Sequence, residues 1–432
     1  MTERAPRRWL ILSHAFNMDG RAASLTVTDK IPHLRAAGIE PVVYSAVTGT
    51  QDQRFEHRRL LPWGPSGLVF DLRHLVSRQV GRGIAYRAVM LLASLVLALP
   101  MLLERALTGL RSQWSWSVPA FLRGARRWRR GDLELVYSSG GAYSAHLAGW
   151  WLKRWCGARW IAEVHDPMVF PDRPPRHRDD RLQARLEALI CRHADLAWWF
   201  TEGALEAARG RHPELGDRGI VVVPGAEPMP VHADYLPGPV CVLGHFGSLS
   251  ESRSLAPFVR ALDALLHQQP GWRTHLRLEV YGGDIDAPAQ ALIRASGLAD
   301  VVLPMGRLER DPVSGRSGRE RVLERMQQVD VLLLLHGDTA ECAQYIPSKL
   351  YDYFWARRPV LALTHRNPQL DALVRAHDGQ VAPTLDTPAV VAALTALLDR
   401  WAGAGLAAIA VPPVGVRQAV QRLIAEVDAR HA

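Results

Sequence analysis

Cysteine is scarce in this chain, with four residues among 432. They are Cys156, Cys191, Cys241 and Cys342, and no two of them form a Cys-x-x-Cys pair. Structural zinc sites and disulfide frameworks use closely spaced cysteines, so neither kind of site is indicated. This use of cysteine is typical of a protein of the reducing cytosol.

Motifs that bind nucleic acids or dinucleotides are also missing. The sequence has no zinc finger, no RNP-like strand and no aromatic array for base stacking, so nucleic acid is not expected as a partner. The stretch "YSSGGAYSAH", residues 137–146, places two glycines between a strand-like and a helix-like run. No Gly-x-Gly-x-x-Gly motif with a downstream acid follows, and a dinucleotide site is not predicted.

Acidic residues are few in the first part of the chain. Residues 1–130 hold 20 Lys and Arg against 8 Asp and Glu, and the remainder holds 32 against 35. The whole net charge of +9 therefore comes from the first 130 residues. Such a one-sided excess indicates a polyanionic partner, either nucleic acid or an anionic membrane surface.

The neighbouring residues favour the membrane. Residues 88–103, "AVMLLASLVLALPMLL", carry no charge, but this run is shorter than a bilayer span and Pro100 interrupts it. The following stretch, 105–130, contains seven arginines, three tryptophans and no acid, a composition that suits a headgroup layer. We expect docking at the interface rather than a spanning helix. The alternative is a buried helix followed by a solvated basic helix.

The N-terminal stretch "MTERAPRRWLILSHAF" has too short an apolar run for a cleavable signal peptide. Together with the basic segment, it predicts a cytoplasmic protein at the inner face of the cell membrane.

Strand-like and helix-like runs alternate along the chain, which predicts an α/β protein with parallel sheets. We expect two facing Rossmann-like domains with a cleft between them. The predicted parts are an N-terminal domain over 1–228 with an apolar and basic insert near 84–130, a proline-rich linker at 224–239, a C-terminal domain over 236–410, and a helix over 411–432 that could cross back to the first domain. Pro32 predicts a kink or break in the first helix.

Two segments of the second half carry candidate phosphate ligands. In "GHFGSLSESRSL" a strand ends, a small-residue loop follows with Gly247 and Ser248, and Arg253 precedes a helix. Such a turn offers free backbone N–H groups to a phosphate, although its glycines could be structural. In "IPSKLYDYFW", Lys349 and Asp352 lie three residues apart on one helix face. The ammonium could neutralise a phosphate and the carboxylate could bind two sugar hydroxyls, or the two could form a plain surface ion pair.

The chain resembles the retaining nucleotide-sugar glycosyltransferases of the two-domain GT-B type, in particular glycosyltransferase family four. The resemblance covers nearly the whole chain. The segments that carry it are "EVHDP", "ADLAWWFTEGALE", "VVVPGAEP", "GHFGSLSESRSL", "LEVYGGD", "VVLPMGRL" and "IPSKLYDYFWARRPVLAL".

The resemblance implies a role for each matching residue. Arg253 and Lys349 would hold the donor's diphosphate, helped by the backbone of Gly247 and Ser248, and Asp352 would bind the ribose. The remaining roles fall to Gly306 and Arg307 at the nucleobase, Gly20 at the phosphates from the first domain, and His165 beside the transferred sugar. Asp166 could orient the ring of His165.

The sequence departs from the family's pattern at two places. The usual Glu-x7-Glu pair is incomplete, because Gln344 stands eight residues before Asp352 and Glu341 lies one turn too early. Gly20 is followed by Arg21 where the family has paired glycines. These departures indicate altered sugar contacts.

A metal ion is not required, because two basic side chains can take its role at a diphosphate. The Asp-x-Asp of "GDID", residues 283–286, falls where a turn is expected. The donor would be a UDP-, GDP- or dTDP-sugar, with no other cofactor, and the acceptor an envelope polysaccharide or a lipid-linked saccharide. Two other functions stay open: a nucleotide-sugar epimerase of the same fold, and a non-catalytic membrane-surface or nucleic-acid-binding protein.

Overall fold

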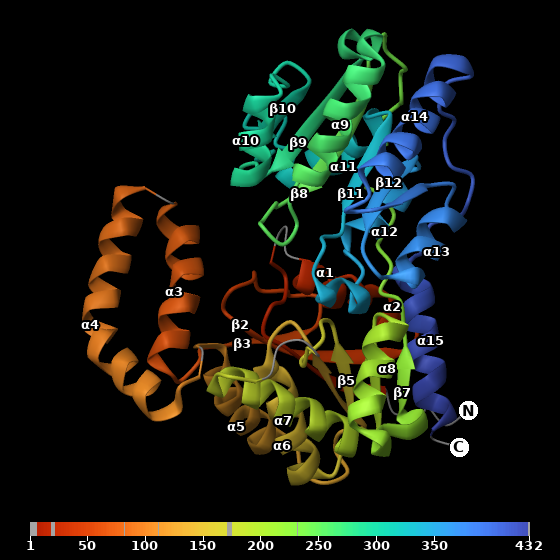
Figure 1. Ribbon diagram of the computed structural model, residues 1–432. Coiled ribbons are helices and arrows are strands. Elements are labelled where there is room, and N and C mark those ends of the chain that lie inside the picture. Colours follow the sequence, from red (N-terminus) through yellow and green to blue (C-terminus); the bar gives the residue numbers. More distant parts are fainter. Residues whose placement is uncertain are drawn as a thin grey trace. The chain divides into compact units, whose positions relative to one another are not determined.

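The computed structural model describes residues 7–18, 22–81, 83–110, 112–170, 175–230 and 232–430. The chain divides into two compact units. Unit 1 comprises Met1–Pro224 and Val416–Ala432, and unit 2 comprises Gly225–Gly415. Each unit contains one parallel sheet covered by helices, so the fold is α/β as predicted (Figure 1).

The sheet of unit 1 has seven strands in the order β3-β2-β1-β4-β5-β6-β7, and every neighbouring pair is parallel. The strands are β1 (Arg7–Ser13), β2 (Ile39–Ala46), β3 (Glu56–Leu60), β4 (Leu135–Ser139), β5 (Arg159–Val164), β6 (Leu196–Trp199) and β7 (Gly219–Val221). Apart from the edge strand β3 (EHRRL), their near-continuous apolar runs are typical of strands that are buried on both faces.

Helices cover both faces of this sheet. The helices of unit 1 are α1 (Ala22–Thr28), α2 (Lys30–Ala36), α3 (Pro65–Val80), α4 (Ile84–Thr108), α5 (Ser117–Arg127), α6 (Tyr143–Cys156), α7 (Arg178–His193), α8 (Glu202–Arg211) and α15 (Val416–Ala429), with 3₁₀ turns η1 (Ser112–Trp116) and η2 (Pro213–Arg218), and α3 and α4 do not cover the sheet. Leu10 and Leu12 of β1 lie in the core shared with α5 to α8. Trp9 and Ile11, which point the other way, lie in the core shared with α2 and α15.

The first helical segment is broken, as the proline predicts. Helix α1 ends at Thr28 and α2 begins at Lys30, so that Pro32 falls in the first turn of α2. A proline is tolerated there because the first N–H groups of a helix have no partner within it. The break places Lys30 at the start of α2, where its side chain reaches into the core.

The predicted insert takes a form that neither sequence interpretation described. Helices α3 and α4 form a hairpin that stands out from the sheet of unit 1 (Figure 1). Helix α4 has 25 residues and is exposed over most of its surface, so the prediction of a buried helix is wrong. Trp116 and Trp128 are 0% and 3% exposed and lie in the core, so these tryptophans do not form an interfacial belt.

Unit 2 has a six-stranded parallel sheet in the order β10-β9-β8-β11-β12-β13. The strands are β8 (Cys241–Gly247), β9 (Leu276–Gly282), β10 (Val302–Gly306), β11 (Val331–Leu335), β12 (Val360–Thr364) and β13 (Gln380–Pro383). The helices are α9 (Ala256–Gln268), α10 (Ala287–Ala295), α11 (Gly318–Gln328), α12 (Lys349–Ala356), α13 (Pro368–Ala376) and α14 (Thr387–Gly403), with 3₁₀ turns η3 (Pro270–Thr274) and η4 (Ala340–Gln344).

The strand order locates the binding edge of each sheet. In unit 2 the order reverses between β8 and β11, and in unit 1 it reverses between β1 and β4. Ligands of open α/β sheets bind beyond the carboxyl ends of the strands at such a switch point. In unit 2 the loop after β8 carries Ser248 and Arg253, and the segment after β11 leads to Lys349.

Candidate functional site

The end of β8 lies directly against the side chain of Lys349. Gly247 ends the strand with a φ of 132°, a conformation that residues with a side chain rarely adopt. A Cβ atom at this position would lie 2.9 Å from Nζ of Lys349. A residue other than glycine would therefore displace the ammonium group, and the backbone after β8 stays open to a ligand beside it.

Lys349 is a buried cation without a partner. Its Nζ atom is buried and makes no hydrogen bond with any described residue. Burial lowers the pKa of Lys349 to about 7, and the charge of Arg253 adds to this effect. Nε of Arg253 is likewise buried without a hydrogen bond to the described part of the chain. An isolated buried charge is costly, and an anion that reaches both groups would offset that cost.

His245 completes this cluster of basic groups from within β8. The imidazole is fully buried, and its Nδ1 atom lies 3.1 Å from the carbonyl oxygen of Leu333. Burial holds the pKa of His245 well below its usual value, and the charge of Lys349 lowers it further. The ring is therefore neutral, and the positive charge of the cluster comes from Lys349 and Arg253.

Asp352 lies one turn along α12 from Lys349, but the two do not pair. An oxygen of the Asp352 carboxylate lies 3.3 Å from a guanidinium nitrogen of Arg319, which belongs to α11. Burial raises the pKa of Asp352, and Arg319 opposes that rise. The plain surface ion pair between Lys349 and Asp352 is therefore wrong. Arg319 is a neighbour that sequence reasoning missed.

The other donor residues from the sequence analysis are only loosely grouped. Ser248 is exposed directly after β8. Arg307 is exposed after the edge strand β10, and it makes no hydrogen bond or ion pair with the rest of this set. Gly306 has a φ of 70° and Gln344 is buried in η4. Gly20 and Arg21 lie outside the described residues.

The Asp-x-Asp of "GDID" serves a structural purpose. The carboxylate of Asp286 caps α10 by accepting a hydrogen bond from the N–H of Ala289 at 3.2 Å. It also accepts hydrogen bonds from Ser254 and from the N–H of Leu255 before α9. Within the described ranges, no group of three or more His, Cys, Asp or Glu side chains could hold a metal ion.

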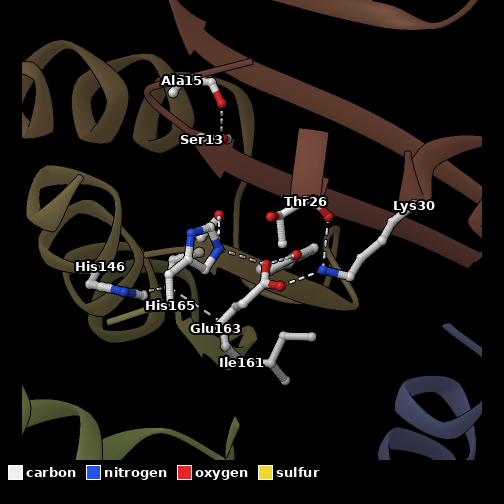
Figure 2. Close-up of polar contacts among 11 residues, drawn as sticks. Ser13, Ala15, Thr26, Lys30, His146, Ile161, Glu163 and His165 are labelled. Carbon is white, nitrogen blue, oxygen red and sulfur yellow. Dashed lines mark hydrogen bonds and ion pairs between the residues drawn. The ribbon is translucent and has the colours of Figure 1, made fainter. Parts of the chain in front are cut away.

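In unit 1, His165 follows β5 and is held by side chains from two strands. Its Nε2 atom lies 3.1 Å from the hydroxyl of Ser139 and 3.5 Å from a carboxylate oxygen of Glu163 (Figure 2). Its ring stacks on Phe200, with centroids 5.0 Å apart. These contacts fix the orientation of the ring, and none of them involves its other nitrogen, Nδ1.

Glu163 is the centre of a buried polar network. The carboxylate is 0% exposed and accepts a hydrogen bond from the ammonium of Lys30 (Figure 2). It also accepts one from the hydroxyl of Tyr137. Burial alone would raise the pKa of Glu163, but Lys30 and His165 lower it to about 2. Glu163 therefore stays ionised and presents a fixed negative charge to the ring of His165.

The acid that the structure places beside the ring of His165 is Glu163, whereas the predicted partner Asp166 is exposed. Successive residues of an extended segment point to opposite sides, so Glu163 and His165 share a side of the chain. The alternation in "EVHDP" could have indicated this arrangement.

A small cavity lies near the same end of the sheet in unit 1. Its volume is about 190 Å³. Its lining includes Tyr143 at the start of α6, Met168 and Phe170 after β5, and Asp179 and Gln183 of α7. Aromatic rings beside carboxylate and amide groups can bind a sugar, whose faces are apolar and whose edges carry hydroxyls.

Comparisons with known proteins give matches of structure only. A scan against protein-family models finds no match, and neither does a search of curated proteins. Among solved structures, a TarM variant of S. aureus bound to fondaparinux, α-GlcNAc-glycerol and UDP matches with a TM-score of 0.58, 8% identity and 98% of each chain covered. HepE of Anabaena in complex with UDP matches with a TM-score of 0.54 and 12% identity, over 98% of this chain and 100% of HepE.

The lipopolysaccharide outer core galactosyltransferase WaaB matches with a TM-score of 0.53 and 12% identity, over 91% of this chain and 90% of WaaB. A Listeria monocytogenes protein named for UDP-N-acetylglucosamine 2-epimerase activity also matches, with a TM-score of 0.50 and 12% identity, over 99% of this chain and 97% of that one. The structural neighbours are thus nucleotide-sugar glycosyltransferases of GT-B type, with an epimerase among them. The two sheets of this chain have the GT-B fold over its full length.

Proposed function

We propose that the protein is a glycosyltransferase that moves a sugar from a nucleotide-sugar donor to a saccharide acceptor. The observation that carries this proposal is the pair of basic side chains, Lys349 and Arg253, at the switch point of unit 2. Both have buried nitrogens without hydrogen-bond partners in the described chain, and no acidic side chain neutralises them there. A diphosphate is an anion of suitable charge for two cations. UDP in the structures of HepE and TarM supports uridine as the nucleoside attached to this diphosphate.

The same residues would accelerate the transfer. As the bond from the sugar to the diphosphate breaks, negative charge grows on the leaving phosphate while the sugar becomes oxocarbenium-like. Lys349 and Arg253 are already in place and need no reorganisation to stabilise that charge. Asp352 would bind the ribose hydroxyls, with Arg319 holding its carboxylate, and Gly306 and Arg307 would meet the base.

Unit 1 would provide the acceptor side. We place His165 beside the transferred sugar, with its ring held by Glu163 and Ser139. The cavity lined by Tyr143 and Gln183 would take the acceptor saccharide. The resemblance to glycosyltransferase family four supports retention of configuration. The lipopolysaccharide outer core in WaaB's name supports a lipid-linked or envelope polysaccharide acceptor. The basic first 130 residues support a place at the inner face of the membrane.

An enzyme assay with matched variants tests the proposal. We expect release of UDP from UDP-sugars to require an acceptor glycan, and Lys349→Ala or Arg253→Ala to lower kcat by about a hundredfold to a thousandfold. Arg294→Ala, on the exposed side of α10, removes a similar charge and should leave the rate unchanged. Normal turnover in both site variants would remove the donor-site assignment.

The second candidate is a nucleotide-sugar epimerase, which the Listeria match favours. Incubation with the donor alone distinguishes the two functions. An epimerase converts the sugar nucleotide without any acceptor, whereas a transferase only hydrolyses it slowly. A protein that binds no sugar nucleotide would instead be a non-catalytic membrane-surface protein.

A further inference from the structure

Helix α4 has an unusual surface for a protein in water. It runs from Ile84 to Thr108, and on length and composition alone it is the one helix of the described chain that could cross a membrane. At 1.5 Å per residue it is roughly 37 Å long. None of its 18-residue apolar window is buried, unlike an apolar helix in a protein core.

Most of its circumference is apolar and open. Ten large apolar side chains are between 45% and 86% exposed, namely Ile84, Val89, Leu91, Leu92, Leu95, Val96, Leu99, Leu102, Leu103 and Leu107. The half-buried positions are 86, 90, 93, 97, 101 and 108, and position 104 is buried; their spacing of three and four marks the single stripe that packs on α3. Contiguous apolar patches of this extent are rare on soluble monomers and indicate a partner.

The charges at this surface fit an anionic partner. Arg87 and Arg105 are exposed near the two ends of α4. The only acid of the helix, Glu104, is buried and accepts a hydrogen bond at 2.8 Å from the N–H of Ser66 in α3. The apolar face is therefore bordered by cations alone, which is the pattern of helices that bind acidic phospholipids.

The connectivity of the hairpin argues against a transmembrane path. Helix α3 follows β3, and α4 leads into η1, where Trp116 is fully buried in the core of unit 1 (Figure 1). Both ends of the hairpin are thus held by one unit, so α4 could cross a bilayer only if α3 crossed it too. Helix α3 carries Asp71, Arg73 and Arg78, and Asp71 is buried with an oxygen 3.6 Å from Nε2 of His14. Helix α3 therefore stays with unit 1.

We propose that α4 is a membrane-docking helix that lies in the interface of an anionic phospholipid bilayer, with α3 as its support. The leucine and valine side chains enter the acyl region to the depth of an interfacial helix, and Arg87 and Arg105 contact the headgroups. This inference goes beyond the proposed transfer reaction and is independent of it, because no residue of α4 belongs to the donor or acceptor sites.

Flotation of the full-length protein with vesicles tests the proposal. We expect binding to vesicles of phosphatidylcholine and phosphatidylglycerol that weakens with salt, and little binding to phosphatidylcholine alone. The double variant Leu95→Glu, Leu99→Glu should lose at least tenfold in vesicle binding. The matched control Val313→Glu, Leu385→Glu makes the same change at exposed apolar positions of unit 2 and should bind as the unmodified protein does.

Further measurements distinguish a membrane from a second copy of the chain as the partner of α4, and docking on the bilayer from insertion across it. Light scattering measures whether the protein forms a dimer. If the unmodified protein is a dimer, the α4 variant is a monomer and neither floats with vesicles, the exposed face of α4 serves self-association and the proposal is overturned. Equal binding of the α4 variant and the control would overturn it too. For the geometry, Gly83→Cys places a thiol at the hairpin tip, outside the apolar face and with no atom within 4 Å of its Cβ. The native cysteines are buried and should not react. An impermeant maleimide should label the new thiol on sealed vesicles, and protection would indicate insertion across the bilayer.

Discussion

The buried ammonium of Lys349 allows a test of whether this side chain serves donor binding or the stability of unit 2. Burial lowers its pKa from the usual 10.5 to about 7, so the unfolded chain holds the proton more tightly than the folded one. The resulting loss of stability is fully present below about pH 7 and fades as the pH rises toward 10.5. We expect Lys349→Met to raise the free energy of unfolding of unit 2 by about 2–4 kcal/mol near pH 7 and to abolish donor binding.

Urea unfolding at pH 7 and pH 10 measures this effect. The gain from Lys349→Met should shrink at the higher pH, because the folded protein has by then released the proton of Lys349 and no longer holds a buried charge. A loss of stability at pH 7 would show that the ammonium group has a structural partner, and would contradict its assignment to the donor site.

The same pKa predicts how donor affinity depends on pH. Above about pH 7 the free site has lost the proton of Lys349, and a bound diphosphate would restore it. Binding then takes up a proton, and we expect the affinity for a UDP-sugar to fall about tenfold per pH unit above 7. Calorimetry between pH 6 and 8.5 measures it. Lys349→Arg keeps its charge and should show no such slope, and an equal slope in both proteins would contradict the mechanism.

Sequence reasoning identified single residues where local spacing carries the information. The i and i+3 spacing of Lys349 and Asp352 and the loop after β8 follow from short motifs. The partners Arg319 and Lys30 do not, because they approach from elements 33 and 133 residues away. Adjacency in sequence indicates Asp166 as the partner of His165, whereas the alternation of an extended chain indicates Glu163.

At the scale of elements, one buried ion pair ties α2 to β5. Lys30 and Glu163 are 1% and 0% exposed, so removing either one leaves the other as an uncompensated charge in the core. We expect Lys30→Met to destabilise unit 1 by about 3–5 kcal/mol, and Lys30→Met with Glu163→Leu to recover a large part of that loss. Urea unfolding of the two single variants and the double variant measures the coupling. Additive losses would show that the two side chains act independently.

The elements themselves were largely predictable, and the exceptions have physical causes. Buried parallel strands are short apolar runs, and such runs predict most strands of both sheets. The edge strands β3 and β13, with the sequences EHRRL and QVAP, lack such a run and are not predicted. The break beside Pro32 followed from the geometry of proline. Helix α4 extends beyond its uncharged run because Glu104 can be buried against α3 and Arg87 can remain in solvent. Trp116 and Trp128 lie in the core although their sequence context indicates a membrane interface, because tryptophan suits both environments.

At the scale of the whole molecule, the chain returns to unit 1 at its C-terminal end. Val416, Val420, Leu423 and Val427 of α15 are nearly fully buried in the core shared with α2. Each such side chain contributes about 1.5–3 kcal/mol, so together they approach the whole stability of a typical domain. Removal of residues 416–432 should therefore unfold unit 1 and leave unit 2 folded.

Scanning calorimetry with and without UDP tests this division of stability. We expect two transitions in the full-length protein, and UDP at a hundred times its Kd should stabilise unit 2 by about 2.7 kcal/mol, or roughly 5–10 °C. Lys349→Met identifies which transition belongs to unit 2, because it should raise that one alone and remove its response to UDP. The protein lacking residues 416–432 should keep the UDP-sensitive transition and lose the other. A UDP response that disappears with this truncation would mean that donor binding needs unit 1, and would contradict a donor site built from unit 2 alone.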